Sequence, residues 1–495
     1  MNTFVENLKD MTNYGYTENQ AVKHLTTKSA VLDLFSLCGA YRNRTDVDCI
    51  NMFKKALEEN ESLAMKCLFY LRDCRGGQGE RRFFRVCFKW LCGNQSEAAA
   101  RNVKYISEFG RWDDLIYSTL NTPMFVNAMQ IIKEQLVLDL ECKTPSLLGK
   151  WMPSENASSI VTKKAASEVR KSLGLSHKEY RKALTTLRTR INIVEKLMSE
   201  NRWDEIEFDK LPSKAGLIYK NAFARRDILA KKYEAFAKDK TTKVNADTLN
   251  PVEIAHRIFN SWDLRNQPVD STDRLMLQKY WNNLKNYYNG KQENGIAIVD
   301  TSGSMSGIPL EAAVSMGAYI AERGHGPFAN HFITFSSRPE LVEFKGVDIV
   351  DKFNRARSAN WQMDTNIEAV FNLLLNTALS KGTKAEDMPE RLYIFSDMEF
   401  NGCLQDANHK DLCSADAVET LLESIAKKWA DVGLELPKVI FWNLDARQEN
   451  IPALGGRFSY ISGFSMSAIE SVLSGKDGYD LMLEVLNKER YSVIS

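Results

Sequence analysis

Three oxygen-bearing side chains that could bind a divalent cation lie close together in residues 296–306, IAIVDTSGSMS. Asp300 supplies a carboxylate, and Ser302 and Ser304 supply hydroxyls at alternate positions of a short, glycine-containing turn. Such hard oxygen ligands suit Mg²⁺ or Mn²⁺, with waters completing the coordination shell. The apolar residues before Asp300 predict a strand buried on both faces, which places the turn at its carboxyl end. We therefore predict a metal site; the alternative is that Asp300 and the serines cap the following helix.

The pattern Asp-x-Ser-x-Ser after an apolar strand resembles the metal-ion-dependent adhesion site of von Willebrand A domains. That resemblance implies two further ligands, a threonine on a second loop and an aspartate after a later buried strand. Thr365 in MDTNI and Asp397 after LYIFS match these positions in the family's order. The resemblance also implies that the bound Mg²⁺ or Mn²⁺ recruits a carboxylate or phosphate from a partner. The predicted metal ligands are Asp300, Ser302, Ser304, Thr365 and Asp397.

The elements that would position these ligands form a doubly wound α/β sheet, because strands and helices alternate from Gly295 onward. We expect strands near 295–300, 331–335, 340–344, 391–396 and 437–443 and helices near 309–323, 366–380, 415–432 and 465–474. Residues 1–290 carry apolar residues at helical spacing almost throughout, with little strand-like alternation. The expected class is α plus α/β: an all-helical, HEAT-like solenoid or ring at 1–290, then a Rossmann-like von Willebrand A domain at 291–495.

Composition argues for an ordinary globular protein with a local concentration of positive charge. The chain has 65 Lys plus Arg against 64 Asp plus Glu, whereas residues 150–245 alone have 22 against 12. Nine scattered cysteines without a Cys-x-x-Cys pair predict reduced thiols in an intracellular, cytoplasmic setting. The first residues lack the basic and apolar regions of a signal peptide, and no apolar run approaches the length of a membrane span. We expect neither membrane nor DNA as a partner.

The basic stretch also contains a recognisable motif. Gly174-Leu-Ser176-His177-Lys178 resembles a segment of the TROVE module of Ro ribonucleoproteins, with Leu175 in place of its tryptophan. The stretch from Phe208 to Asp227 resembles an uncharacterised family of plant, fungal, bacterial and viral proteins with the same layout. The resemblance implies contacts with single-stranded RNA ends or small structured RNAs, since exposed cations bind phosphates by releasing counterions. The predicted RNA-binding residues are Lys163, Lys164, Arg170, Lys171, His177, Lys178, Arg181, Lys182, Lys214 and Arg225.

The leading interpretation is a non-catalytic RNA-binding protein of Ro-like layout whose metal site takes an acidic group of a partner. A metal-dependent protein scaffold that never contacts RNA is the alternative, because a charged helix face is often only a solvated one. A metal-dependent nuclease is a third class, and it would need a second metal or a positioned base beside Asp300 and Asp397.

Overall fold

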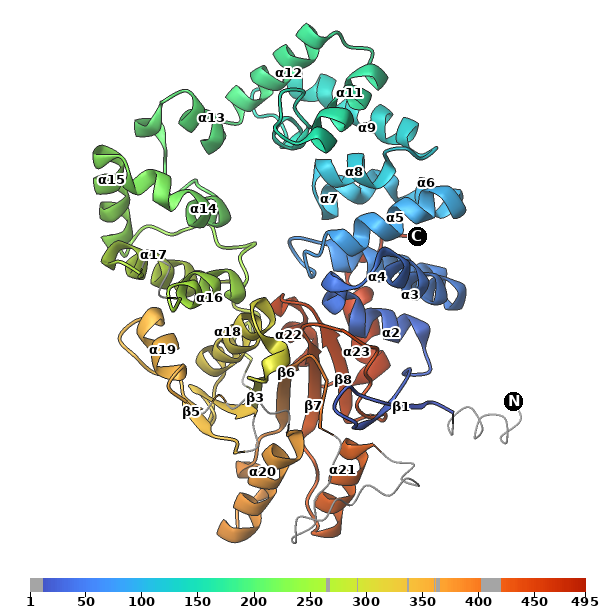
Figure 1. The fold of residues 1–495 in the computed structure, drawn as a ribbon, viewed down its shortest axis with the longest axis vertical. Coiled ribbons are helices and arrows are strands. Elements are labelled where there is room, and N and C mark those ends of the chain that lie inside the picture. The colour runs from blue at the N-terminus through green and yellow to red at the C-terminus, as the bar shows by residue number, and fades with distance from the viewer. Residues whose placement is uncertain are drawn as a thin grey trace. The chain divides into compact units, whose positions relative to one another are not determined.

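A computed structural model describes residues 12–263, 268–291, 293–335, 338–359, 361, 366–401 and 420–495. Two compact units can be distinguished. The sheet unit comprises the described residues up to Thr45, Glu58–Asn60 and Leu249–Asn487. The helical unit comprises Asp46–Leu57, Glu61–Thr248 and Lys488–Ser495. The chain therefore has a helical part and a mixed sheet with mostly parallel strands, as the predicted α plus α/β class requires (Figure 1).

The sheet unit is built on a six-stranded sheet of order β5-β4-β3-β6-β7-β8. All neighbouring pairs are parallel except β4 and β5, which are antiparallel. Four predicted strands lie where expected, the short edge strand covers only three residues, and the last strand was not predicted. The strands are β3 (Gly295–Asp300), β4 (His331–Phe335), β5 (Leu341–Glu343), β6 (Arg391–Ser396), β7 (Lys438–Asn443) and β8 (Phe458–Ser462).

Both faces of the sheet are covered, which explains why its central strands read as continuous apolar runs. Alternate residues such as Ile296, Ile298 and Ile394 belong to one core with α20 (Ile367–Lys381) and α21 (Leu421–Asp431). The other helices of this unit are α2 (Ala30–Leu37), α16 (Pro251–Asn260), α17 (Ser271–Asn282), α18 (Ile308–Arg323), α19 (Ile349–Ala356), α22 (Ile469–Val472) and α23 (Gly478–Leu486).

Gly317 allows α18 to approach β3 closely on the opposite face. A Cβ atom at this position would lie 2.4 Å from Cγ2 of Val299. We expect Gly317→Ala to lower the free energy of unfolding of the sheet unit by about 1–3 kcal/mol, because the packed core cannot absorb an extra methyl group. Urea denaturation checks this. Gly456→Ala is the control in the same unit, because its Cβ would meet nothing within 4 Å, and it should be neutral or slightly stabilising.

The N-terminal segment was not predicted to join the sheet unit, and the expectation of an all-helical part at residues 1–290 was wrong for residues 14–24. Strands β1 (Tyr14–Tyr16) and β2 (Val22–His24) form an antiparallel hairpin. Isolated bridges connect Gln20 with Asn401 and His24 with Ile451. Three-residue strands carry almost no periodic signal, and the residues that bridge this hairpin to the rest of the unit lie hundreds of residues away in sequence.

The helical unit consists of consecutive helices that pack mainly against near neighbours in sequence. They are α3 (Asp46–Glu59), α4 (Glu61–Arg72), α5 (Arg82–Asn94), α6 (Ser96–Asn102), α7 (Ile106–Phe109), α8 (Trp112–Thr119), α9 (Phe125–Glu141), α10 (Leu148–Trp151), α11 (Ile160–Ser172), α12 (His177–Arg190), α13 (Val194–Ser199), α14 (Ser213–Ala224) and α15 (Asp227–Lys238).

A buried ion network joins three helices of this unit. The Asp114 carboxylate at the start of α8 has no exposed surface. Its Oδ2 atom accepts hydrogen bonds from Nε and Nη2 of Arg72, at 2.8 and 2.5 Å. Its Oδ1 atom accepts from Nε of Arg85 at 2.7 Å, and the amide of Arg111 donates to Oδ2. The network therefore links α4, α5 and α8 through one carboxylate.

The C-terminal residues Lys488–Ser495 return to the helical unit. Arg490 donates from Nε and Nη2 to the buried Asp73 carboxylate at 2.5 and 2.9 Å, and the Tyr491 hydroxyl donates to the same group. The Tyr491 ring stacks on Phe109 and meets Tyr70 edge-on. This tail thus completes a core that is otherwise built from the first helices of the unit.

Candidate metal site and basic surface

The two predicted carboxylate ligands are brought together at the topological switch point of the sheet. Strand β3 is followed by β4 on one side, and its other neighbour β6 is followed by β7, so the connections after these two adjacent strands run in opposite directions. In such sheets, ligands bind outside the carboxyl ends of the strands at this point. Asp300 is the last residue of β3, and Asp397 directly follows the adjacent parallel strand β6.

Asp300 is completely buried and already accepts two hydrogen bonds. Its Oδ1 atom accepts from the Ser302 amide at 2.9 Å, and its Oδ2 atom accepts from the Ser396 hydroxyl at 2.5 Å. Burial, together with the neighbouring Asp397 carboxylate, raises the pKa of Asp300 to about 7. Two buried carboxylates that repel each other in this way are stabilised by a cation placed between them.

The two serines lie beside this carboxylate pair. The hydroxyl oxygens of Ser302 and Ser304 are 3.0 Å apart, so both can face one small ion. Neither caps α18, because the residue before that helix is Gly307 and no side chain caps its first turn. The helix-capping alternative therefore does not account for these serines, and their chemistry fits a hard divalent cation.

Asp397 carries a contact that sequence reasoning missed. Its Oδ1 atom accepts from the Glu399 amide at 3.2 Å, and its Oδ2 atom accepts from Nη2 of Arg447 at 3.0 Å. Arg447 lies beyond β7, and its Nη1 atom is 2.9 Å from Oε2 of Glu18. Because Arg447 is fifty residues from Asp397 in sequence, only the parallel pairing of β6 with β7 brings the two together.

Thr365, the fifth predicted metal ligand, lies outside the described residues. Asn366 is described, and its side chain caps α20 by accepting from the Ala369 amide at 2.9 Å. Within the described ranges, no group of three or more His, Cys, Asp or Glu side chains is arranged for metal binding. The candidate site instead combines two carboxylates with hydroxyls, Asp300 and Asp397 with Ser302 and Ser304.

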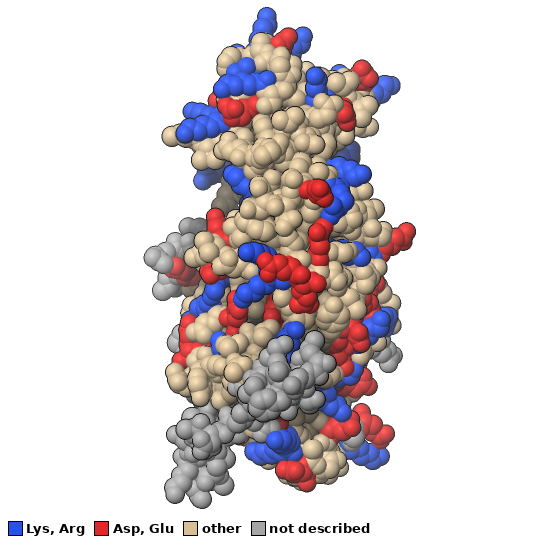
Figure 2. All heavy atoms as spheres, turned by 90° about the vertical axis from the view of Figure 1, so that its right-hand side faces the viewer, with Lys and Arg blue, Asp and Glu red and all other residues tan. Residues whose placement is uncertain are grey.

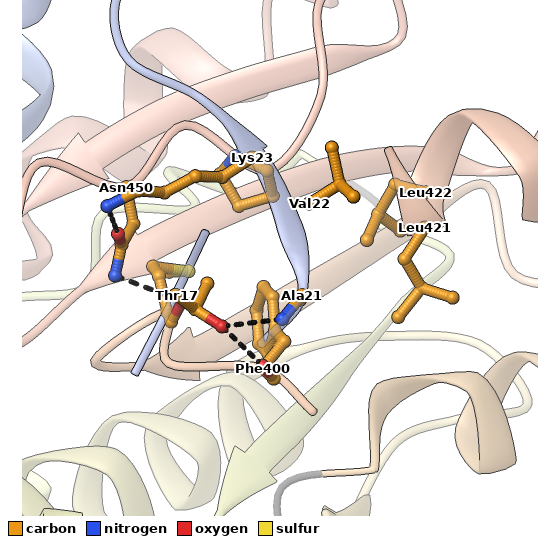
Figure 3. A pocket seen from close by; sticks show the side chains of 10 residues that line it. Thr17, Ala21, Val22, Lys23, Phe400, Leu421, Leu422 and Asn450 are labelled. Carbon is orange, nitrogen blue, oxygen red and sulfur yellow. Dashed lines mark hydrogen bonds between the residues drawn. The ribbon is translucent and has the colours of Figure 1, made fainter. Parts of the chain in front are cut away.

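The N-terminal hairpin holds the loop that follows Asp397 (Figure 3). The buried Glu399 carboxylate accepts from the Glu18 amide and from Nδ2 of Asn450, both at 2.8 Å. Asn450 in turn accepts from the buried Lys23 ammonium. Burial lowers the pKa of Lys23 and raises the pKa of Glu399. The cavity between the hairpin and this loop has a volume of only about 10 Å³, so the two segments are packed against each other and leave no ligand pocket.

A larger hollow of about 500 Å³ lies at the other end of the strands, near the amino ends of β6, β7 and β8. Its cationic side chains are already paired: Arg391 with Glu293, Lys438 with Asp477 and Arg457 with Glu435. The carboxylate pair lies at the carboxyl ends of the strands and this hollow at their amino ends, so we assign the hollow no role in the candidate site.

The motif Gly174-Leu-Ser176-His177-Lys178 forms the turn between α11 and α12. Gly174 adopts a positive φ of 69°, and its amide bonds to the carbonyl of Lys171, which ends α11. Ser176 then begins α12 with a capping box, in which its hydroxyl accepts from the amide of Glu179 and the Glu179 carboxylate accepts from the Ser176 amide. The glycine and serine of the motif are therefore structural, and His177 and Lys178 remain as candidate contacts.

Glu155 holds His177 and Arg170 together. Its Oε1 atom is 2.8 Å from Nδ1 of His177 and accepts from Nε of Arg170 at 2.9 Å. Burial opposes ionisation of Glu155, but the hydrogen bonds from His177 and Arg170 together lower the pKa of this carboxyl. The histidine is consequently oriented, with most of its side chain exposed to solvent.

The ten predicted RNA-binding residues differ in their environment. Within the described residues, Lys163, Lys164, Lys178 and Lys182 are exposed and make no ion pair, whereas Lys171 pairs with Glu168 and Arg181 donates to the carbonyl of His177. Figure 2 shows Lys and Arg side chains, with some Asp and Glu among them, at the top of the view, where α11 and α12 lie in Figure 1.

Two of the ten lie elsewhere. Lys214 and Arg225 belong to α14 and its end, which Figure 1 shows apart from α11 and α12. Two further arginines of the basic stretch are structural. Arg188 donates to the carbonyls of Gly149 and Met152, and Arg190 to carbonyls at the end of α9. The structure therefore narrows the basic surface to α11, α12 and the turn between them.

The fold and the site define a protein with a helical unit that carries a basic surface and a doubly wound sheet unit with a candidate cation site. The chain belongs to the family described as Domain of unknown function (DUF2828), which matches residues 17–119 and 146–291. A second family, Domain of unknown function (DUF7788), matches residues 294–490. Neither description mentions a TROVE or von Willebrand A domain, so those two assignments stay predictions.

One curated relative is the "Uncharacterized protein L728" of Acanthamoeba polyphaga mimivirus. It is 29% identical over 514 residues, which cover 94% of this chain and 86% of the relative. Among solved structures, the chain is similar to the crystal structure of the Deinococcus radiodurans RO (RSR) protein. That likeness has a TM-score of 0.46 and 12% identity, and it covers 93% of this chain and 99% of the other.

The remaining general expectations concern thiols and membranes. Every cysteine that the structure describes is a free thiol. In the same parts of the chain, none of the helices combines the length and the apolar character that crossing a membrane requires.

Proposed function

We propose that this protein binds RNA without catalysing a reaction, through the basic surface formed by α11, α12 and the turn between them. The observation that carries this proposal is the set of four exposed lysines that make no ion pair within the described residues, Lys163, Lys164, Lys178 and Lys182. A lysine that is not already paired can neutralise a phosphate and release its counterion, whereas a paired one must first give up its partner. The resemblance of the turn to the TROVE module supports RNA as the polyanion.

We further propose that the sheet unit binds Mg²⁺ or Mn²⁺ and that this ion takes an acidic group of a partner. Asp300 and Asp397, with the hydroxyls of Ser302 and Ser304, would hold the ion. The repulsion between the two buried carboxylates supports this assignment, because a cation relieves it. The bound ion would supply an electrophilic position for one anionic oxygen, and the chain's own groups would fix its place.

The RNA proposal is tested with a triple variant, Lys164→Glu, Lys178→Glu and Lys182→Glu. Electrophoretic mobility shifts with single-stranded RNA are compared over a range of salt concentrations. The logarithm of the RNA association constant falls linearly with the logarithm of the salt concentration. If three phosphate contacts are lost, this slope should become less negative by about 2, since each contact contributes about 0.7 for single strands. At low salt the affinity should fall at least about tenfold.

The matched control reverses three exposed lysines of the sheet unit, Lys381, Lys384 and Lys476. It changes net charge equally, so it should leave the salt slope almost unchanged. A parent protein that binds no RNA at low salt would instead favour the protein-scaffold alternative. Cleavage of labelled RNA in Mn²⁺, abolished by Asp300→Ala, would contradict the non-catalytic proposal and favour the nuclease.

A further inference from the structure

Arg447 occupies a position at the candidate metal site that neither the predicted ligand set nor the family descriptions assign. Its Nη2 atom donates to Oδ2 of the buried Asp397, 3.0 Å away, and its Nη1 atom reaches Oε2 of Glu18 at 2.9 Å. The Arg447 side chain is 35% exposed, whereas the Asp397 side chain is not exposed at all. One guanidinium therefore spans from the buried carboxylate to the solvent-facing Glu18.

This contact gives Asp397 a positive partner that belongs to the chain itself. A divalent ion held by Asp397 and Asp300 would be attracted to the same carboxylate, so it competes with the guanidinium. An arginine freed from one carboxylate still presents a planar set of N–H donors that matches an anion with two oxygens. The loop that carries Arg447 is fixed, because its carbonyl accepts a hydrogen bond from Arg44 and its amide donates to the Asp445 carbonyl.

Glu18 shows what the outer part of the guanidinium can bind. It comes from the N-terminal hairpin, its side chain is 41% exposed, and its carboxylate lies on Arg447 as an external anion would. Its backbone is held independently, since its amide donates to Glu399. The Glu18 side chain can therefore leave Arg447 without loss of the hairpin contact.

We propose that Arg447 is the anion-binding residue of the metal site, and that a phosphate group displaces Glu18 from it and binds Arg447 and the metal ion together. This inference rests on the proposed metal site. Two further arginines lie close to the loop that carries Arg447: Arg44 donates to the Arg447 carbonyl, and Arg42 interacts electrostatically with Asp445. A phosphate is favoured over a carboxylate because it carries more negative charge, which these cations attract.

The consequence is that metal and phosphate bind cooperatively through one side chain. Mn²⁺ affinity of the full chain is measured by electron paramagnetic resonance, alone and with phenyl phosphate or acetate at equal concentration. In the parent, phenyl phosphate should tighten Mn²⁺ binding at least about fivefold, the lower end of usual coupling between sites. Acetate should tighten it less.

Three variants separate the possibilities. Arg447→Gln should abolish the effect of phenyl phosphate and bind Mn²⁺ alone as tightly as the parent or more tightly, because a competing cation is gone. Glu18→Gln should enlarge the effect of phenyl phosphate. Arg457→Gln, which alters an arginine at the other edge of the sheet, should behave as the parent does.

A parent that binds no Mn²⁺ would contradict the proposed metal site itself. If Mn²⁺ binds but phenyl phosphate has the same effect in the parent and in Arg447→Gln, the role of Arg447 is refuted while the metal site stands. Equal or stronger coupling by acetate would overturn the choice of phosphate and identify the ligand as a carboxylate.

Discussion

Asp300→Asn should reduce Mn²⁺ affinity more than about 100-fold, because loss of an outer partner of a metal ligand alone costs about 10- to 100-fold. Asp300 is completely buried at the switch point of the sheet. Its amide replacement keeps the shape of the side chain but removes the charge that the cation requires. Isothermal titration calorimetry of the full chain with Mn²⁺ measures the loss.

The same residue predicts how metal binding depends on pH. Because burial and Asp397 raise the pKa of Asp300 to about 7, the carboxyl is largely protonated at pH 6, and a metal must displace that proton. Mn²⁺ affinity should therefore rise with pH between about 6 and 8 in the parent. Without metal, the raised pKa means that the folded chain binds this proton more tightly than the unfolded chain, so the free energy of unfolding falls as pH rises from the usual pKa of this carboxyl, 3.8, to about 7.

Asp445→Asn is the matched control for Asp300→Asn. Asp445 follows β7 as Asp397 follows β6, but its carboxylate accepts from Asn43 and is not a predicted ligand. Its replacement should change Mn²⁺ affinity only a few-fold. Undiminished Mn²⁺ binding by Asp300→Asn would show that the site is assigned wrongly. The Asp300→Asn variant should be at least as stable as the metal-free parent at pH 8, because an Asn amide at this position is not repelled by Asp397. Unfolding would therefore not explain its loss of metal binding.

Asp114→Asn should lower the free energy of unfolding of the helical unit by about 3–5 kcal/mol, the usual cost of removing one partner from a buried ion pair. The substitution leaves Arg72, which is 3% exposed, without its counter-charge. It also weakens the contact that Arg85 makes from α5. Urea denaturation monitored by circular dichroism, combined with hydrogen exchange of peptides from α4 and α8, measures the change.

Asp46→Asn provides the comparison for that measurement. Asp46 pairs with Arg82 at the surface of the same unit, with both side chains well exposed. Its loss should cost no more than about 1 kcal/mol, because solvent screens exposed pairs. Equal effects of the two substitutions would mean that the Asp114 network does not stabilise the unit as its burial indicates.

Sequence reasoning succeeded where burial leaves a local pattern. Strands β3 and β6 are covered on both faces, so residues 296–299 and 392–395 read as apolar runs followed by polar groups. Asp300 and Asp397 could be placed at one edge because parallel strands end together. Strand β8 was missed because Ser459 and Ser462 interrupt its apolar character, although both are buried.

The rest depends on contacts between distant segments. Nothing in the sequence around Glu18 or Arg447 indicates that the two meet, or that Arg447 reaches Asp397. Likewise, the basic stretch does not reveal which cations are already used. Arg188 and Lys164 have the same charge, yet the first binds carbonyls of the chain and the second is exposed.

The return of residues 488–495 to the helical unit has a consequence for synthesis of the chain. Tyr70 and Phe109 are made early, but Tyr491, which packs against both, is made after the whole sheet unit. During translation these rings and the Asp73 carboxylate lack their contacts with Arg490 and Tyr491 until several hundred further residues have been made. The nascent chain should thus offer chaperones a binding surface that disappears only after residues 488–495 have been made.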